Sequence, residues 1–266
     1  MFKNYFITFK SGVKGYRRAI SFIAKNKLSY FYIFPILLNI LLFILGIKMV
    51  DFFTDQINSY VSNLIFSESN NDSLWYGFLN SVLYWTIWVV SKIVFVYIFT
   101  LIGGYFTIII LSPIFAILSE KTAEIFTGEK TIFNLKQFVK DMKRAIIIAV
   151  RNMIIQFFFT ILFILTSIIP LIGWVIGILG NFLVSSYFYG FAFMDYSNER
   201  HKLSLKESVL FVRKNKGFAS GVGSIFSICF LIPFIGGTLA SFLAIMCVVN
   251  ATIGVEEMRN STRLIP

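Results

Sequence analysis

The sequence predicts an all-α integral membrane protein with two long transmembrane helices, two helical hairpins that reverse at prolines, and amphipathic helices at the membrane surface. Three observations predict this fold. The chain of 266 residues is 57% hydrophobic and only 14% charged, whereas about a quarter of the residues in soluble domains are charged. Its basic residues fall in short blocks between long apolar runs. An Ile-Pro-x-Ile-Gly pattern occurs twice, each time within a long uncharged stretch.

The composition also excludes several classes of function. The net charge of +11 does not indicate nucleic-acid binding, because the Lys and Arg flank apolar runs, as they do beside an anionic membrane leaflet. The cysteines Cys229 and Cys247 are interpreted as small packing residues, and His201 as a solvated loop residue. Because no catalytic or metal-binding motif occurs, we expect no enzyme activity, metal or cofactor. No linker divides the chain, which predicts one domain over residues 1–266.

The first three elements follow from charge and periodicity. Residues 1–29 hold seven Lys and Arg and no acid, interleaved with apolar residues at helical spacing, which predicts a basic amphipathic helix on the cytoplasmic interface. Residues 30–50 are apolar and long enough to cross the hydrocarbon core. Residues 51–73 hold four acids and no Lys or Arg. By the positive-inside rule they are expected to form an acidic loop on the outer side.

A second transmembrane helix is predicted over residues 74–119. This run is longer than one crossing requires, so the helix either projects beyond the bilayer or breaks near Gly103–Gly104. Pro113 is expected to kink its cytoplasmic end. Residues 120–151 hold seven basic and four acidic residues with an amphipathic stripe, which predicts a cytoplasmic helix at the interface.

Two uncharged stretches, residues 152–194 and 217–255, are each interpreted as a hairpin that reverses at the repeated pattern. The turn residues are Pro170, Gly173, Pro233 and Gly236. Proline ends a helix, and glycine permits a tight reversal. Turns in water usually recruit polar residues, so these apolar turns predict hairpins that penetrate only part of the bilayer. Hairpins that cross it fully, with hydrophobic tips, are the alternative.

The remaining segments place the ends of both hairpins on the side of the membrane that carries the basic residues. The linker of residues 195–216 holds six basic and three acidic residues, and its Ser204–Glu207 segment is a capping box that predicts a short helix. The tail of residues 256–266 is short and mixed in charge. The positive-inside rule therefore places both termini in the cytoplasm.

Several motifs along nearly the whole chain, in order, resemble the CysZ-type sulfate permeases, whose broader family includes the etoposide-induced membrane proteins. The motif residues are Pro35 and Asn39 in the run 34–42, Pro113 and Glu120 in the run 113–121, Gly104–Phe106, Gly128, the two proline turns and Met194–Tyr196. The resemblance implies two long transmembrane helices, two partly penetrating hairpins and a homo-oligomer. It also implies sulfate uptake for cysteine biosynthesis across the bacterial cytoplasmic (inner) membrane.

The resemblance also implies where an anion binds. In that family a glycine–apolar–arginine motif implicated in sulfate binding precedes the first transmembrane helix, and it aligns here with Lys27, Leu28 and Ser29. The expected anion-binding groups are Lys25, Lys27 and the Ser29 hydroxyl, with lysines that only anchor a helix at the interface as the alternative. The predicted function is a permease or channel for sulfate or a related small anion. The alternative is a non-transporting scaffold that organises the bilayer.

Overall fold

The computed structural model describes residues 2–66, 74–129, 135–232 and 235–263, and within these ranges every regular element is helical. The elements are α1 (Phe2–Lys25), η1 (Leu28–Tyr32), α2 (Ile33–Phe66), α3 (Leu74–Ile110), α4 (Ser112–Thr127), α5 (Leu135–Thr166), α6 (Ile172–Arg200), α7 (Leu205–Lys214), α8 (Lys216–Cys229) and α9 (Gly236–Arg263). Within α2, α3, α5, α6 and α9 lies a segment long and apolar enough to cross a membrane. The predicted class, an all-helical multi-pass membrane protein, is confirmed.

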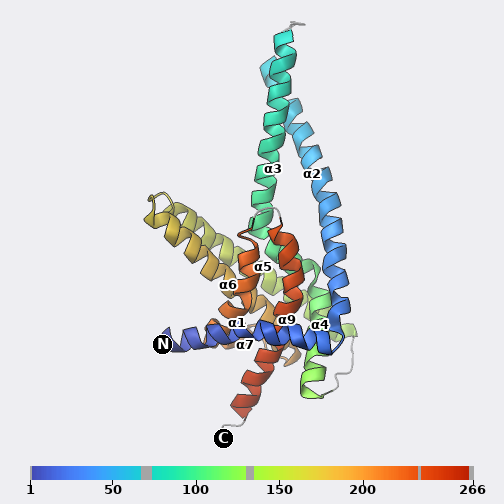
Figure 1. Cartoon of the computed structure of the whole chain (residues 1–266), viewed down its shortest axis with the longest axis vertical. Coiled ribbons are helices and arrows are strands. Elements are labelled where there is room, and N and C mark those ends of the chain that lie inside the picture. Colours follow the sequence, from blue (N-terminus) through green and yellow to red (C-terminus); the bar gives the residue numbers. More distant parts are fainter. Residues whose placement is uncertain (1, 67–73, 130–134, 233–234, 264–266) are drawn as a thin grey trace.

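Helices α2 and α3 project away from the other helices, converge toward their far ends and spread apart toward the rest of the molecule (Figure 1). They contain 34 and 37 residues, so each is roughly 50–55 Å long, against about 30 Å for a hydrocarbon core. The expected loop over residues 51–73 is wrong as far as Phe66, because α2 continues to that residue. No Pro or Gly interrupts residues 51–66. Polar side chains do not by themselves end a helix.

The predicted helix over residues 74–119 is divided at Leu111, between α3 and α4. Gly103–Gly104 lie inside α3, so of the two alternatives the break at that pair is wrong. Pro113 causes the division, because it has no N–H to donate to the carbonyl of Ile109 and its ring clashes there. The Ser112 hydroxyl donates to that carbonyl instead, over 2.8 Å.

The segment over residues 120–151, predicted to form a cytoplasmic interfacial helix, is divided between α4 and α5. Helix α4 ends at Thr127, and Gly128 follows in the left-handed conformation with φ 77°. Helix α5 begins at Leu135 and continues without a break into the first hairpin. The charged first turns of α5 therefore extend the hairpin arm instead of forming a separate element.

Helix α1 lies across the base of the molecule, roughly perpendicular to α2 and α3 (Figure 1). It packs against α8 and α9, and the Asn250 amide of α9 donates to the Gly12 carbonyl over 2.7 Å. The far ends of α2 and α3 lie on one side of α1, and the C-terminus lies on the other (Figure 1). The predicted N-terminal helix is confirmed over residues 2–25.

The two predicted hairpins are α5–α6 and α8–α9, and their turns point to the same side of α1 as the far ends of α2 and α3 (Figure 1). Helix α6 continues to Arg200 and α9 to Arg263, so parts of the expected linker and tail are helical. The capping box at Ser204 and Glu207 is confirmed at the start of α7. Its hydrogen bonds from Ser204 hold the pKa of the Glu207 carboxyl below its ordinary value.

Helix α8 is the packing centre, because its glycines allow close approach on two sides. A Cβ atom built on Gly223 would lie closer than 3.0 Å to the Ser186 carbonyl oxygen of α6. A Cβ atom on Gly221 would lie equally close to the Phe9 carbonyl oxygen of α1. Small residues at helix interfaces let the backbones approach in this way. These glycines fix the positions of α1 and α6 relative to the second hairpin.

Two buried ion pairs connect the hairpin helices near the ends that lie opposite the turns. Arg144 of α5 makes a bidentate contact with Asp195 of α6, with Nε–Oδ2 3.2 Å and Nη2–Oδ1 3.0 Å, and the Ser208 hydroxyl of α7 donates to the same carboxylate. The Glu256 carboxylate of α9 pairs with Arg200 and accepts a hydrogen bond from His201 Nε2 over 2.6 Å. The interpretation of His201 as a free, solvated residue is therefore wrong.

Candidate functional site

The predicted anion-binding residues lie at the corner between α1 and α2. Lys25 ends α1, Lys27 and Ser29 follow within the turn, and all three side chains are exposed. The corner is anchored by Leu28 and Phe31, which are only 3% and 2% exposed. We call Lys25, Lys27 and Ser29 the basic corner. Its backbone is held in place by the buried Leu28 and Phe31, and its side chains are exposed. A site that attracts anions from water needs both features.

A further cation reaches the basic corner from α4. Lys121 donates to the Tyr30 hydroxyl over 2.9 Å, one residue beyond Ser29. No acid occurs in residues 1–32, so no carboxylate from α1 or η1 neutralises the corner. Lys27 has φ 57°, the left-handed conformation in which glycine alone is unstrained. The resemblance aligns the glycine of the family motif with this position, and glycine adopts a positive φ without strain.

The other motif residues hold helices together. The Asn39 amide donates to the Pro35 carbonyl and to the Ser241 hydroxyl of α9, both over 2.7 Å. Pro113 opens α4, and Glu120 is partly buried and interacts electrostatically with Arg200. The structure therefore places Pro35 and Asn39 in the first turns of α2, where Asn39 contacts α9, Pro113 at the start of α4, and Glu120 within α4.

The first hairpin turn has a different conformation from the one expected. Ile172 donates its N–H to the Pro170 carbonyl over 2.8 Å, and Leu171 between them has φ 63° and ψ −67°. This is a γ-turn of the strained kind, with Leu171 as its central residue. Gly173, which was expected to permit the reversal, already lies in α6. Its role is close approach, since a Cβ atom there would lie closer than 3.0 Å to the Thr166 carbonyl oxygen.

The second turn repeats this packing. Gly236 opens α9, and a Cβ atom there would lie closer than 3.0 Å to the Cys229 carbonyl oxygen at the end of α8. Gly173 and Gly236 each lie seven residues after the residue they approach, so the sequence repeat is also a structural repeat. Pro233 lies outside the described residues. Both tips are apolar and exposed, including Ile168 at 76% and Leu231 at 60%.

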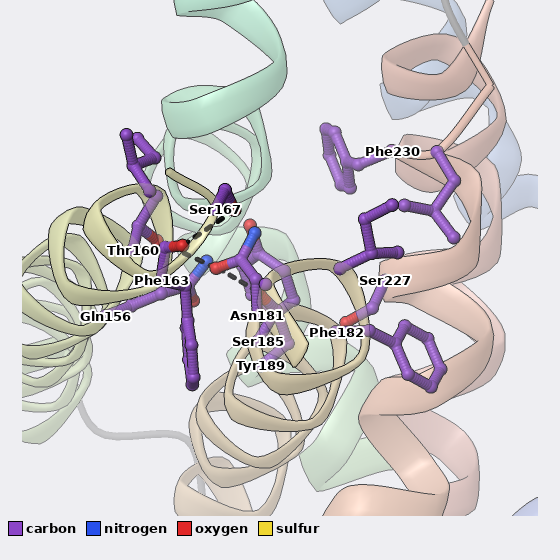
Figure 2. A pocket seen from close by; sticks show the side chains of 14 residues that line it. Gln156, Thr160, Phe163, Ser167, Asn181, Phe182, Ser185, Tyr189, Ser227 and Phe230 are labelled. Atoms are coloured by element: carbon purple, nitrogen blue, oxygen red, sulfur yellow. Dashed lines mark hydrogen bonds between the residues drawn. The ribbon is translucent and has the colours of Figure 1, made fainter. Parts of the chain in front are cut away.

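A polar pocket of about 280 Å³ lies between α5, α6 and α8 (Figure 2). Its polar lining residues are Gln156, Thr160, Ser167, Asn181, Ser185, Tyr189 and Ser227. Its lining includes none of the described Asp, Glu, Lys, Arg or His side chains. The pocket runs from Gln156 to Ser167, beside the hairpin turn, which is roughly 16 Å along α5. The apolar side chains of Phe163, Ile164, Ile178, Phe182, Phe230 and Leu231 complete the lining. The site is therefore neutral and mixed in polarity, and it lies in the part of the hairpin that is predicted to lie in the membrane.

Hydrogen bonds inside the pocket fix the direction of its polar groups. The Tyr105 hydroxyl of α3 donates to Gln156 Oε1 over 2.7 Å, and Gln156 Nε2 donates to the Ser185 hydroxyl over 2.8 Å. The Thr160 hydroxyl donates to Asn181 Oδ1 over 2.8 Å (Figure 2). The Ser227 hydroxyl, on a residue that is 4% exposed, has no hydrogen-bond partner among the residues that the structure describes and points from α8 toward α6 (Figure 2).

The spacing of polar residues in the sequence indicates this pocket, but the distribution of charged residues does not. Gln156 and Thr160 are one helical turn apart on α5, and Asn181, Ser185 and Tyr189 are spaced by one turn on α6. Polar residues at intervals of four form one stripe along a helix. The contribution of Ser227 has no such local signal, because it comes from the other hairpin.

A comparison with known families identifies the chain. The family model described as sulfate transporter CysZ/etoposide-induced protein 2.4 matches residues 16–239. The match begins within α1 and ends within α9, so it covers the basic corner, both long helices and the polar pocket. The chain belongs to the sulfate transporter CysZ/etoposide-induced protein family.

Proposed function

We propose that this protein is a permease or channel for sulfate or a related small anion in the cytoplasmic membrane of a bacterium. The observation that carries the proposal is the family match over residues 16–239. The uncharged hairpins support it, since residues 152–194 and 217–255 hold no acid that would repel an anion or relay a cation. The transported anion supplies sulfur assimilation and cysteine biosynthesis. No catalytic step forms part of the proposal.

The path lies between the hairpins and the long helices, and the basic corner forms its cytoplasmic end. Partial penetration of the hairpins shortens this path. Helix α8 has 14 residues, and the uncharged part of α5 runs over residues 152–166. Each is about 21–23 Å long at 1.5 Å per residue, which is less than a hydrocarbon core of about 30 Å. The partner arms α6 and α9 are long enough to cross it, so the short uncharged arms are what limits the depth in this proposal. Both termini then lie in the cytoplasm, and the exposed apolar faces of α2 and α3 contact lipid and further copies of the chain.

The proposal predicts that reversing the charge of the basic corner removes transport. In the variant Lys25→Glu/Lys27→Glu, two cations that attract an anion become two carboxylates that repel it. We expect sulfate flux into proteoliposomes to fall at least about tenfold, because like charges at close range cost several times the thermal energy even at a surface. Radiolabelled sulfate uptake measures the effect.

The control variant is Lys10→Glu/Lys14→Glu, because these exposed lysines lie on the same helix outside the corner. We expect it to retain most of the flux. Wild-type flux equal to that of empty liposomes, with sulfate, sulfite and thiosulfate tested in turn, would remove the permease proposal. If both variants instead lose membrane or partner association in cells while the wild type transports no anion, the scaffold function takes its place.

A further inference from the structure

We infer that the polar pocket of the first hairpin is an intramembrane binding site for a tetrahedral oxyanion, which it holds with neutral hydrogen-bond donors. This inference rests on the proposed anion transport and assigns a site for it apart from the basic corner. The pocket is built for a ligand, because the Ser227 hydroxyl is buried and unpartnered at its wall. A buried hydroxyl without a partner costs free energy, and a ligand oxygen in the pocket would remove that cost.

The second hairpin shows that this polarity is not needed to form the fold. The repeat offset is 63 residues, from Pro170 to Pro233. At that offset, the equivalents of Gln156, Thr160, Asn181 and Ser185 are Ala219, Gly223, Ala244 and Val248. All four equivalents are buried and lack polar side-chain atoms. Two helices of this hairpin type therefore pack with small apolar residues, and the polar lining of the first hairpin has another purpose.

The hydrogen-bond directions leave three donor groups available to a ligand in the pocket, beside hydroxyl oxygens that can accept, such as that of Ser167, whose proton goes to the Phe163 carbonyl. Gln156 Nε2 donates to Ser185, so the Ser185 hydroxyl keeps its own proton for a further acceptor. Thr160 donates to Asn181 Oδ1, which leaves the Asn181 Nδ2 group free to donate. Ser227 supplies a third donor from the opposite wall. Three donors on two walls, with no carboxylate in the lining, match a ligand that presents acceptor oxygens in several directions.

The absence of a countercharge from the lining decides the strength of binding. A lysine or arginine in a low-dielectric site would hold an anion tightly and slow its release. Neutral donors stabilise the anion less strongly, so the anion can leave the pocket again, as conduction requires. A volume of about 280 Å³ leaves room for a small ion and several of its waters. The pocket therefore fits an anion in transit, while the basic corner gathers anions at the surface.

The test is sulfate binding and sulfate flux of the variants Ser227→Ala and Asn181→Asp. The first removes one donor, and we expect about tenfold weaker sulfate affinity, since hydrogen bonds to charged ligands are strong. The second keeps the shape of the side chain and its acceptor for Thr160 but adds a carboxylate, so we expect sulfate flux to fall to background. Radiolabelled sulfate binding to purified protein and uptake by proteoliposomes give the two readouts.

The matched control is Ser224→Ala, because Ser224 is a buried serine of the same helix whose hydroxyl donates to the Gly221 carbonyl over 2.9 Å and does not line the pocket. Size-exclusion profiles show that each variant folds. If the wild type transports sulfate and both pocket variants match Ser224→Ala, the pocket assignment is overturned and the permease proposal stands. If the wild type shows no flux but Ser227→Ala weakens sulfate binding, the pocket stands without transport. A wild type that binds no sulfate overturns the inference.

Discussion

Replacing Arg144 by alanine is expected to destabilise the protein by about 3–5 kcal/mol, the cost of leaving one partner of a buried ion pair alone. Asp195 is 2% exposed and would keep only the hydrogen bond from Ser208 among the contacts described above. The Arg144 guanidinium also donates to the Leu203 carbonyl, so its loss frees the loop before α7 from the hairpin. Thermal unfolding in detergent, followed by tryptophan fluorescence, measures the change.

The exposed pair of Arg18 and Glu257 provides the control. Its side chains are 48% and 50% exposed, and exposed pairs contribute about 0–1 kcal/mol. Glu257→Ala is therefore expected to leave the unfolding temperature nearly unchanged. An Arg144→Ala variant as stable as Glu257→Ala would show that the buried pair does not hold the first hairpin to α7.

Gly223→Ala is expected to cost about 3 kcal/mol, because the added methyl group overfills a close contact between helices. Its Cβ would lie closer than 3.0 Å to the Ser186 oxygen and to the Gly190 nitrogen, and both are backbone atoms. Neither can rotate away, so α6 and α8 must move apart. The unfolding temperature in detergent gives the measurement, and the polar pocket between these helices would be distorted as well.

Gly77→Ala is the matched control, since Gly77 lies within α3 and a Cβ there meets nothing within 4 Å. Alanine is a better helix former than glycine by about 0.5–1 kcal/mol, so this variant is expected to be slightly more stable. Equal stability of Gly223→Ala and Gly77→Ala would contradict the close packing of α6 on α8.

The sequence was most informative where a physical constraint acts on every residue of a segment. Charged residues are excluded from the hydrocarbon core, so the two uncharged stretches identified both hairpins. The repeated pattern located the reversal of the first hairpin near Pro170. The same reasoning misplaced the end of α2, because acidic residues 51–66 indicate the side of the membrane and not the end of a helix. It also attributed the reversal to Gly173, whereas Leu171 takes the positive φ. A pattern shows that a turn occurs, but the packing of both arms decides which residue is strained.

The candidate site was predicted in part. The exposed position of Lys25, Lys27 and Ser29 at a turn follows from a basic helix that meets an apolar one, while their binding of an anion stays a prediction. The polar pocket was not predicted, since its residues are uncharged and lie within apolar runs. Its Ser227 comes from a different hairpin and meets Asn181 only through the packing of α8 on α6. Such a site depends on tertiary contacts, which local patterns do not contain.

The depth of the hairpin tips tests most directly whether two uncharged hairpins enter the membrane without crossing it. Nitroxide labels on cysteines replacing Ile168 and Leu231 report on the two tips, which are 76% and 60% exposed in the protein. A label replacing Tyr60, 73% exposed on the projecting part of α2, serves as the water-exposed control. In proteoliposomes we expect both tip labels to collide with dissolved oxygen and to be shielded from a water-soluble paramagnetic complex on the outer side, where the Tyr60 label is accessible. Tip labels as accessible to that complex as the Tyr60 label would contradict partial penetration.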